Sequence, residues 1–499
     1  MQFTNQSQAK TPILDALLEC ANKNHAAFYT PGHKRGQGIS PLLANCFGAT
    51  VFRADLPELP ELDNLFAPQG VIQEAEELAA AAFGAEKTWF LVNGSTCGVE
   101  AAILATCGVG DKIILPRNVH YSAIAGLILS GAIPIFVYPE YDPVLDIAHS
   151  ITPAGVAAAL SQHPDAKAVM MIYPTYYGVC GDVARIASVV HQYNIPLLVD
   201  EAHAPHFAFH PKLPTPALAA GADLSVQSIH KVLGAMTQAS MLHVQGSRVN
   251  IDRISKSLQL LQSTSPSYLL LASLDAARQQ MAIQGRELMA RTLQLADSAR
   301  NRISQIPELS VLQSAQTPGF IALDKTRLTV TVSGLGLTGF EADEILHQKL
   351  GVTAELPSLQ HLTFIISLGN TEADIEQLVQ CFTTLAERFR QSDKGDKGRR
   401  GGGEEGRRGG EISHSPTLPL SHSPREAFFA ATETLPIQQT SDRISAELVC
   451  PYPPGIPVLM PGEVITPEAL NYLQQIQKMG GYISGCADPS LSSLKVMKI

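Results

Sequence analysis

The fold follows from residues 195–203, which read Ile195-Pro-Leu-Leu-Val-Asp-Glu-Ala-His203, a short apolar run that ends in an acid. Such a run, bounded by turn residues, is typical of a strand buried on both faces of a parallel sheet. A second run, Asp223–Gln227, leads directly into Ser228-Ile-His-Lys231. Asp200 and Lys231 therefore each stand at the carboxyl end of a predicted strand, where parallel α/β sheets gather their ligands.

The surrounding chain, from about 85 to 245, alternates short β-branched runs with amphipathic stretches. One of these stretches, Val183–Gln192, repeats its apolar residues at helical spacing. Strands that alternate with helices are typical of βαβ units. The sequence therefore predicts an α/β fold whose large domain holds a mostly parallel seven-stranded sheet. The predicted strands are Thr88–Val92, Lys112–Leu115, Ile133–Tyr138, Ala168–Tyr173, Ile195–Asp200, Asp223–Gln227 and Ser240–Val244.

The length of 499 residues exceeds what one hydrophobic core usually organises. Beyond the sheet the pattern becomes helical, and a second set of strand-like runs follows after Pro318. These later elements are expected at Tyr268–Gln284, Arg286–Ile306, Arg327–Val332, Phe340–Lys349, Leu362–Ile366 and Glu372–Gln391. We expect an N-terminal segment (1–70), a large cofactor-binding domain (71–306), a small α+β domain (307–391), a disordered linker (392–425) and a C-terminal subdomain (426–499).

The predicted linker is rich in glycine, serine, proline and charge and lacks apolar residues to bury, which is typical of disorder. Its RRGGG and GRRGG pieces could instead form a nucleic-acid-binding segment. They are short and interleaved with acids, so the linker interpretation is preferred.

Composition excludes several classes of protein. With 45% hydrophobic and 16% charged residues, the chain as a whole is globular. A net charge of -10 argues against a general binder of nucleic acid or anionic membranes, so a small-molecule partner is expected. The sequence shows no signal peptide and no apolar run of the roughly 18 residues that a membrane span needs, which predicts a cytoplasmic protein. Its eight cysteines form no CxxC pair and are expected to be reduced.

Lys231 and Asp200 suggest cofactor chemistry when they are taken together. A lysine among apolar residues at a strand end is desolvated, which favours the neutral amine that forms a Schiff base. Alone, this lysine would more often be a solvated surface group. Asp200 supplies the carboxylate that pyridoxal phosphate (PLP) needs against its pyridine nitrogen. A metal site formed by Asp200, His203 and His206 is an alternative, but the full set of ligands that such a site requires is not evident.

Two further segments fit the same cofactor. Asn93-Gly-Ser-Thr-Cys-Gly98 lies between a strand and a helix expected to begin near Val99, so its backbone N–H groups and hydroxyls could form a phosphate cup. An ordinary Ser/Thr helix cap is the alternative. His120 follows the strand Lys112–Leu115 and could stack on the cofactor ring. A lone histidine is more often a capping or core residue.

In chain order these elements give a phosphate cup, a ring-stacking aromatic residue, an aspartate and a lysine, which is the pattern of fold-type I PLP enzymes. More narrowly, the sequence resembles the Orn/Lys/Arg decarboxylase family, in its short form without the N-terminal receiver-like wing domain. The resemblance covers nearly the whole chain, and the linker stands as an insertion. It is carried by Thr30-Pro-Gly-His-Lys-Arg-Gly36, Asp55-Leu-Pro-Glu-Leu-Pro-Glu-Leu-Asp63, Gly94-Ser-Thr96, Arg117-Asn-Val-His120, Asp200-Glu-Ala-His203, Ser228-Ile-His-Lys231, Pro451-Tyr-Pro-Pro-Gly-Ile-Pro457 and Pro461-Gly-Glu463.

The resemblance implies a role for each matching residue. Lys231 would be the Schiff-base lysine, and Asp200 the partner of the pyridine nitrogen. His230 would be a proton donor to the substrate, and Glu463 would bind the substrate's distal cation unless it is a plain surface turn acid. The implied catalytic set is Lys231, Asp200, His120 and His230. The implied cofactor-binding set is Ser95, Thr96, His120, Asp200, Ala202, His203, Ser228, His230 and Lys231, with Ala202 and His120 on the two ring faces and no metal.

The same resemblance implies the reaction. It is the PLP-dependent decarboxylation of lysine, arginine or ornithine to cadaverine, agmatine or putrescine, with release of CO2. A homodimer or larger assembly is implied as well, because fold-type I sites usually lie between subunits. Two alternatives stay open: a fold-type I aminotransferase or other PLP lyase, and a catalytically silent regulatory relative. The linear sequence does not select among the three amino acids.

Overall fold

The computed structural model describes residues 5–396, 419–452 and 455–498. The chain forms two compact units, and each is described by itself. Unit 1 comprises Met1–Thr106, Lys167–Tyr173 and Val183–Ala290, and unit 2 comprises Cys107–Ala166, Pro174–Asp182 and Arg291–Ile499. The predicted site residues of the cup, the aspartate and the lysine all fall in unit 1, whereas His120 and Glu463 fall in unit 2.

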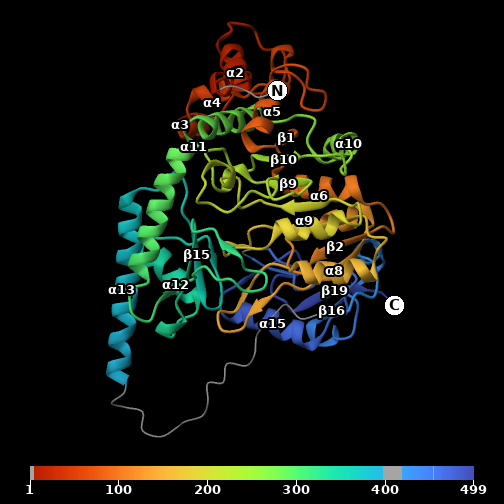
Figure 1. Ribbon diagram of the computed structural model, residues 1–499. Coiled ribbons are helices and arrows are strands. Elements are labelled where there is room, and N and C mark those ends of the chain that lie inside the picture. Colours follow the sequence, from red (N-terminus) through yellow and green to blue (C-terminus); the bar gives the residue numbers. More distant parts are fainter. Residues whose placement is uncertain (1–4, 397–418, 453–454, 499) are drawn as a thin grey trace. The chain divides into compact units, whose positions relative to one another are not determined.

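A seven-stranded sheet confirms the predicted α/β class (Figure 1). Its order is β1-β10-β9-β8-β6-β2-β3. β6, β8 and β9 pair in parallel, as do β2 and β3, whereas β10 is antiparallel to both β9 and β1. The strands are β1 (Lys87–Leu91), β2 (Lys112–Pro116), β3 (Ile133–Val137), β6 (Ala168–Ile172), β8 (Leu197–Asp200), β9 (Leu224–Gln227) and β10 (Ser240–Val244).

These bounds agree with the predicted strands to within two residues. The largest difference is at β8, which begins at Leu197 rather than at Ile195. Pro196 has no N–H to donate to a ladder, so regular pairing starts only after it. The carboxyl end of the strand is where it was predicted, with Asp200 as its last residue.

One helix, which begins in unit 1, was predicted as two. The stretches Tyr268–Gln284 and Arg286–Ile306 form a single helix, α11 (Tyr268–Ile303), which passes through Gly285 without a break. A Cβ at Gly285 would lie 3.0 Å from Cβ of Phe209, so this glycine serves close packing rather than a turn. The α-helices that lie wholly in unit 1 are α1 (Asn5–Gln8), α2 (Pro12–Asn22), α3 (Pro41–Phe47), α4 (Ala49–Ala54), α5 (Val71–Phe83), α6 (Gly94–Thr106), α9 (Val183–His191) and α10 (Ile251–Leu261).

Unit 2 contains an antiparallel sheet of order β11-β13-β15-β14, with α12 and α13 beside it in Figure 1. Leu328, Leu362 and Phe382 are among the fully buried side chains of the core between them. The elements are β11 (Ser310–Val311), β13 (Arg327–Thr331), β14 (Leu356–Pro357), β15 (His361–Ile365), α12 (Gly339–Ile345) continued by a π-turn (Leu346–Leu350), and α13 (Glu372–Asp396). This is the α+β arrangement expected from the second set of strand-like runs.

The rest of unit 2 includes a C-terminal part with its own apolar core around Val449, Leu459 and Leu473. Its elements are α14 (Pro424–Phe429), β16 (Thr432–Pro436), β17 (Cys450–Tyr452), α15 (Pro467–Lys478), β18 (Tyr482–Ser484) and β19 (Ser493–Met497). Earlier in the chain unit 2 has α7 (Tyr121–Ser130), α8 (Pro153–Gln162), and the short strand pairs β4 (Tyr141–Asp142) with β5 (Ile147–Ala148) and β7 (Val179–Cys180) with β12 (Ala322–Leu323).

The two ends of the predicted linker lie in helices. Residues 392–396 belong to α13, and residues 424–425 begin α14. The greater part of the linker, residues 397–418, lies outside the described residues.

Candidate active site

The predicted phosphate cup forms the first turn of α6. This helix begins at Gly94, five residues before the predicted start at Val99, so Ser95 and Thr96 are helical. The N–H groups of a first turn have no partner within the helix and can bind an anion. A Cβ at Gly98 would meet side-chain atoms of Leu91 and Val226 at 2.7 Å each, so this glycine lets α6 lie directly on the sheet. The predicted cup residues are thus part of the helix itself, and Gly98 allows this first turn to approach the sheet closely.

The predicted acid and amine stand at the ends of two paired strands. Asp200 ends β8 opposite Val226 of β9, and Lys231 lies in a short 3₁₀ turn (Ile229–Lys231) four residues beyond the end of β9. Burial raises the pKa of the Asp200 carboxyl, and the positive charge of Lys231 opposes this shift. The Asp200 Oδ1 atom accepts a hydrogen bond of 3.2 Å from the backbone N–H of Ala202. The structure thus places a buried carboxyl group at the end of β8 and, in the turn after the neighbouring strand β9, an amine whose charge acts on it.

Four other predicted site residues, His203, Ser95, Ser228 and His230, make hydrogen-bond contacts in this part of unit 1. The Nζ atom of Lys231 lies 3.0 Å from Nε2 of His203. The Ser228 hydroxyl donates to the Ser95 hydroxyl at 2.7 Å, which joins the end of β9 to the cup. His230 Nδ1 lies 3.0 Å from the Ala239 carbonyl oxygen and must be the donor, because a carbonyl only accepts. The proton that a neutral His230 could take up and return is therefore the one on Nε2.

In unit 2, His120 caps a helix. It is the N-cap of α7, and its Nδ1 accepts a hydrogen bond from the backbone N–H of Ser122 at 3.3 Å. The same nitrogen lies 2.8 Å from the Ser122 hydroxyl. The capping role that the sequence left open is therefore observed. Stacking of His120 on a cofactor ring stays a prediction.

Glu463 is buried, with 1% of its surface exposed, so it is not a surface turn acid. The Arg117 guanidinium donates to both of its carboxylate oxygens, from Nε at 3.1 Å and from Nη2 at 2.9 Å. The backbone N–H of Met460 adds a third bond of 3.0 Å. Arg117 also donates to the carbonyl oxygens of Pro457 and Val458. These contacts give Glu463 a structural role, since it binds the guanidinium that in turn binds Pro457 and Val458, and its predicted substrate contact stays a prediction.

Two residues with buried charges were quoted in motifs but given no role from the sequence. Arg117 is 2% exposed and Glu201 is fully buried. The sequence did contain a signal for Glu201. It is a second acid directly after Asp200, at the end of an apolar run, which is an unusual place for a charged residue. No comparable signal existed for Arg117, because its partner is 346 residues away in the chain.

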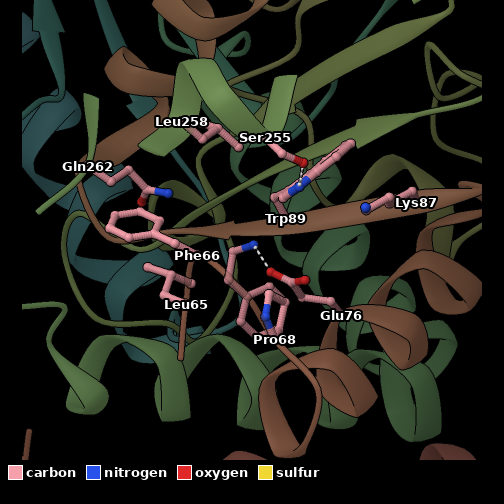
Figure 2. A pocket seen from close by; sticks show the side chains of 10 residues that line it. Leu65, Phe66, Pro68, Glu76, Lys87, Trp89, Ser255, Leu258 and Gln262 are labelled. Atoms are coloured by element: carbon pink, nitrogen blue, oxygen red, sulfur yellow. Dashed lines mark hydrogen bonds between the residues drawn. The ribbon is translucent and has the colours of Figure 1, made fainter. Parts of the chain in front are cut away.

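A cavity of about 70 Å³ also lies in unit 1, and none of the predicted site residues lines it (Figure 2). Its wall includes Phe66, the Trp89 indole, Lys87 and the carboxyl group of Glu76. Glu76 is 6% exposed and accepts a hydrogen bond of 2.9 Å from the backbone N–H of Phe90, drawn in Figure 2. Burial raises the pKa of Glu76 to about 8, against the opposing effects of the Phe90 N–H and the charge of Lys87.

We expect Glu76→Gln to protect the protein from alkaline pH. The pKa of Glu76 lies above its ordinary value of 4.5, so its stabilising contribution is complete below that value and is lost as pH rises through about 8. Glutamine still accepts from Phe90 and cannot ionise. In urea unfolding, the variant should exceed the native protein by roughly 2–5 kcal/mol at pH 9 and show no such advantage at pH 5. Glu77→Gln, at an exposed neighbour, is the control, and an equal difference at both pH values would contradict the assignment.

Within residues 5–396, 419–452 and 455–498, no three or more His, Cys, Asp or Glu side chains are grouped so that they could hold a metal ion. Among the helices of that same part of the chain, none has the length and apolar character needed to cross a membrane.

Comparison with known proteins gives consistent matches along the chain. Residues 11–324 match the family model "Orn/Lys/Arg decarboxylase, major domain", and residues 414–487 match "Orn/Lys/Arg decarboxylase, C-terminal domain". An arginine decarboxylase of Bacillus anthracis is 40% identical over 99% of this chain and 98% of its own length. One of Bacillus subtilis is 39% identical, with 99% of each chain covered.

Solved structures agree on the fold. The lysine decarboxylase LdcF of Francisella novicida superimposes with a TM-score of 0.83 at 21% identity, over 99% of this chain and 82% of that one. The fold is that of the fold-type I PLP-dependent enzymes. With the family models matched over most of its length, the chain belongs to the Orn/Lys/Arg decarboxylase family.

Proposed function

We propose that this decarboxylase of a basic amino acid acts on arginine, releases CO2 and agmatine, and uses PLP carried on Lys231. The observation that supports the cofactor most directly is the desolvated Asp200 carboxylate beside the Lys231 amine, at the ends of adjacent parallel strands. Arginine is favoured because the relatives that match nearly the whole chain at 39–40% identity are named arginine decarboxylases. Three lysine decarboxylases among the relatives are 23–27% identical.

The donor set of unit 1 fits PLP. A buried carboxylate is costly without a cationic partner, and a protonated pyridine nitrogen would supply one to Asp200. The first-turn N–H groups of α6 together with the hydroxyls of Ser95, Thr96 and Ser228 suit a phosphate group. His203 beside Lys231 adds a ring that can contact an aromatic cofactor. We include Ala202 and His120 as the proposed contacts with the two faces of the ring.

When bound, PLP supplies an electron sink for the electron pair that remains on the α-carbon as CO2 departs. Asp200 would hold a proton on the pyridine nitrogen. The positive charge of the protonated nitrogen would stabilise the carboxylate, which burial has removed from water. Lys231 would carry the cofactor and leave its place to the substrate amine. His230 would return a proton to the α-carbon from Nε2, since its Nδ1 is bonded to the Ala239 carbonyl. The broken C–C bond is thus replaced by a C–H bond, and an amine is released.

Glu463 is the proposed candidate for binding the substrate's distal cation. Glu463 could take this role only if its carboxylate accepted a further donor in addition to Arg117 and Met460. We therefore keep Glu463 as a candidate and assign the arginine preference on relatedness. We also propose a homodimer or larger assembly, because sites of this fold class usually lie between subunits. The proposed location is the cytoplasm.

The deciding experiment assays arginine, lysine and ornithine side by side for release of labelled CO2 by the purified protein. We expect kcat/KM for arginine to exceed the other two by about tenfold or more, which corresponds to about 1.4 kcal/mol of transition-state discrimination. A preference for lysine or ornithine would refute the substrate assignment. Turnover that requires a keto acid and releases no CO2 would indicate an aminotransferase, and a protein without bound PLP would indicate a silent relative.

A further inference from the structure

Glu201 is a fully buried acid with no part in the proposed chemistry. It stands between Asp200 and Ala202, at the end of β8. Its Oε1 accepts a hydrogen bond from the backbone N–H of Ala217 at 2.8 Å. Its Oε2 accepts from the Ser225 hydroxyl at 2.5 Å and from the Gln227 amide nitrogen at 2.9 Å. Three donors therefore converge on one carboxylate, and two of them come from β9.

The hydrogen bonds continue across the sheet in one direction. Because the Gln227 amide nitrogen donates to Glu201, its Oε1 must accept from His243 Nε2, which lies 3.2 Å away. His243 then carries its proton on Nε2, and its Nδ1 accepts from the Thr88 hydroxyl at 2.7 Å. Burial lowers the pKa of His243 to about 3, which keeps the ring neutral as this pattern requires. This series of hydrogen bonds links the end of β8 to β9, β10 and β1.

The alternation of side chains along each strand places this series of hydrogen bonds on the sheet face opposite Asp200. Thr88 pairs with His243, and His243 pairs with Ser225, so these side chains share one face. Gln227 is two residues from Ser225 and lies on that face too. Asp200 pairs with Val226, whose side chain points to the other face, toward Gly98 of α6. Asp200 and Glu201, as neighbours in an extended segment, therefore point to opposite faces.

We infer that Glu201 is a positioning residue, whose carboxylate ties the end of β8 to β9 and so fixes the spacing of Asp200 and Lys231. The inference rests on the proposed function, in which these two groups act on one cofactor. Beyond the last pair of β8 and β9, two backbone hydrogen bonds join the strand ends: Glu201 N–H donates to the Val226 carbonyl at 2.9 Å, and Ser228 N–H donates to the Ala202 carbonyl at 3.3 Å. The side-chain tie lies at this point, directly before the turn that carries Lys231.

The Glu201 carboxyl group combines a desolvation cost with three hydrogen bonds that offset it. Burial raises the pKa of Glu201 to about 7, and the bonds from Ser225, Ala217 and Gln227 oppose the shift. All three partners donate in the observed geometry, so the carboxylate is the form that satisfies them. A carboxylate held against its desolvation cost can be replaced only by a group that accepts the same bonds.

The test uses three substitutions and one control in the PLP-loaded and PLP-free protein. Glu201→Leu removes every acceptor, and Ser225→Ala removes one donor, which provides a milder variant if the first does not fold. Glu201→Gln keeps the acceptor for the Ala217 N–H. The donors and acceptors of the remaining hydrogen bonds can exchange roles, because the Gln227 amide can turn and His243 can change tautomer. The control is Thr329→Val in unit 2, which removes a buried bond of 2.9 Å to Thr363 and should leave turnover unchanged.

We expect Glu201→Leu to lower kcat by about 10- to 100-fold with KM within about twofold, the scale of a small misplacement of catalytic groups. The pH titration of the cofactor's visible absorbance should shift, and amide exchange in 197–203 and 224–231 should speed up in the PLP-free protein. Ser225→Ala should shift both in the same direction, and Glu201→Gln should restore most of the native behaviour. An unchanged titration and exchange in Glu201→Leu, or in Ser225→Ala if the first variant does not fold, would overturn the inference. So would a kcat loss that matches only the unfolded fraction. Absent turnover in the native protein would refute the proposed function instead, and the exchange and absorbance measurements would still report on Glu201.

Discussion

Lys231→Ala should abolish the visible absorbance of bound PLP and lower decarboxylase turnover by on the order of 10³- to 10⁶-fold, the range seen when a covalent catalytic group is removed. Lys231 is half-buried, follows β9, and is the cation whose charge acts on Asp200. Its amine would be the covalent attachment point, so no other group at the strand end could replace it. Absorbance spectra of the purified variant, together with CO2 release from arginine, measure both losses.

The control for this experiment is Lys256→Ala, which removes an exposed lysine of α10. It should keep the absorbance band and the turnover of the native protein. Both variants should show the far-ultraviolet circular dichroism of the native fold, because the alanine side chain fits either position without a new buried charge. A Lys231→Ala protein that kept its band and its turnover would show that the cofactor is held elsewhere.

The strand ends could be predicted from the sequence because apolar runs of a parallel sheet are distinctive. Each run of four to six residues with turn residues after it gave a strand whose carboxyl end is nearly fixed, as at Asp200. Residues that follow such ends share one edge of the sheet, so Asp200 and Lys231 could be paired from their positions in the chain alone. The part of the site in unit 1 could therefore be predicted from short sequence patterns.

Other features depend on contacts that have no local signature. The Gly-Ser-Thr-Cys-Gly run contains two glycines, which disfavour a helix, yet it begins α6, and Gly98 lets that helix lie against Leu91 and Val226. Glu463 follows Pro-Gly, which is typical of an exposed turn, and only the fold brings Arg117 to it. Packing overrode local propensity in the first case, and a distant charge decided the second.

Asp200→Asn should lose most of the activity while the protein keeps PLP and becomes no less stable. Asparagine retains the shape and an oxygen that can accept from the Ala202 N–H, and the cup at Ser95 and Thr96 is untouched. Without a carboxylate, nothing at that position favours a proton on the pyridine nitrogen, so we expect kcat to fall by about 10²- to 10³-fold, as when one preorganised electrostatic contact is removed.

The stability of the same variant separates this charge effect from damage to the fold. Burial raises the pKa of Asp200, so the native carboxylate is held at a cost in folding free energy, and a neutral amide relieves it. Thermal unfolding of the PLP-free proteins should therefore give an equal or higher midpoint for Asp200→Asn. Asp200→Ala should lose activity to a similar extent, because it removes the same charge, while its lost contacts lower the midpoint. Full turnover in either variant would mean that another group sustains the electron sink, whereas lost turnover with an unchanged fold would identify the carboxylate charge as the requirement.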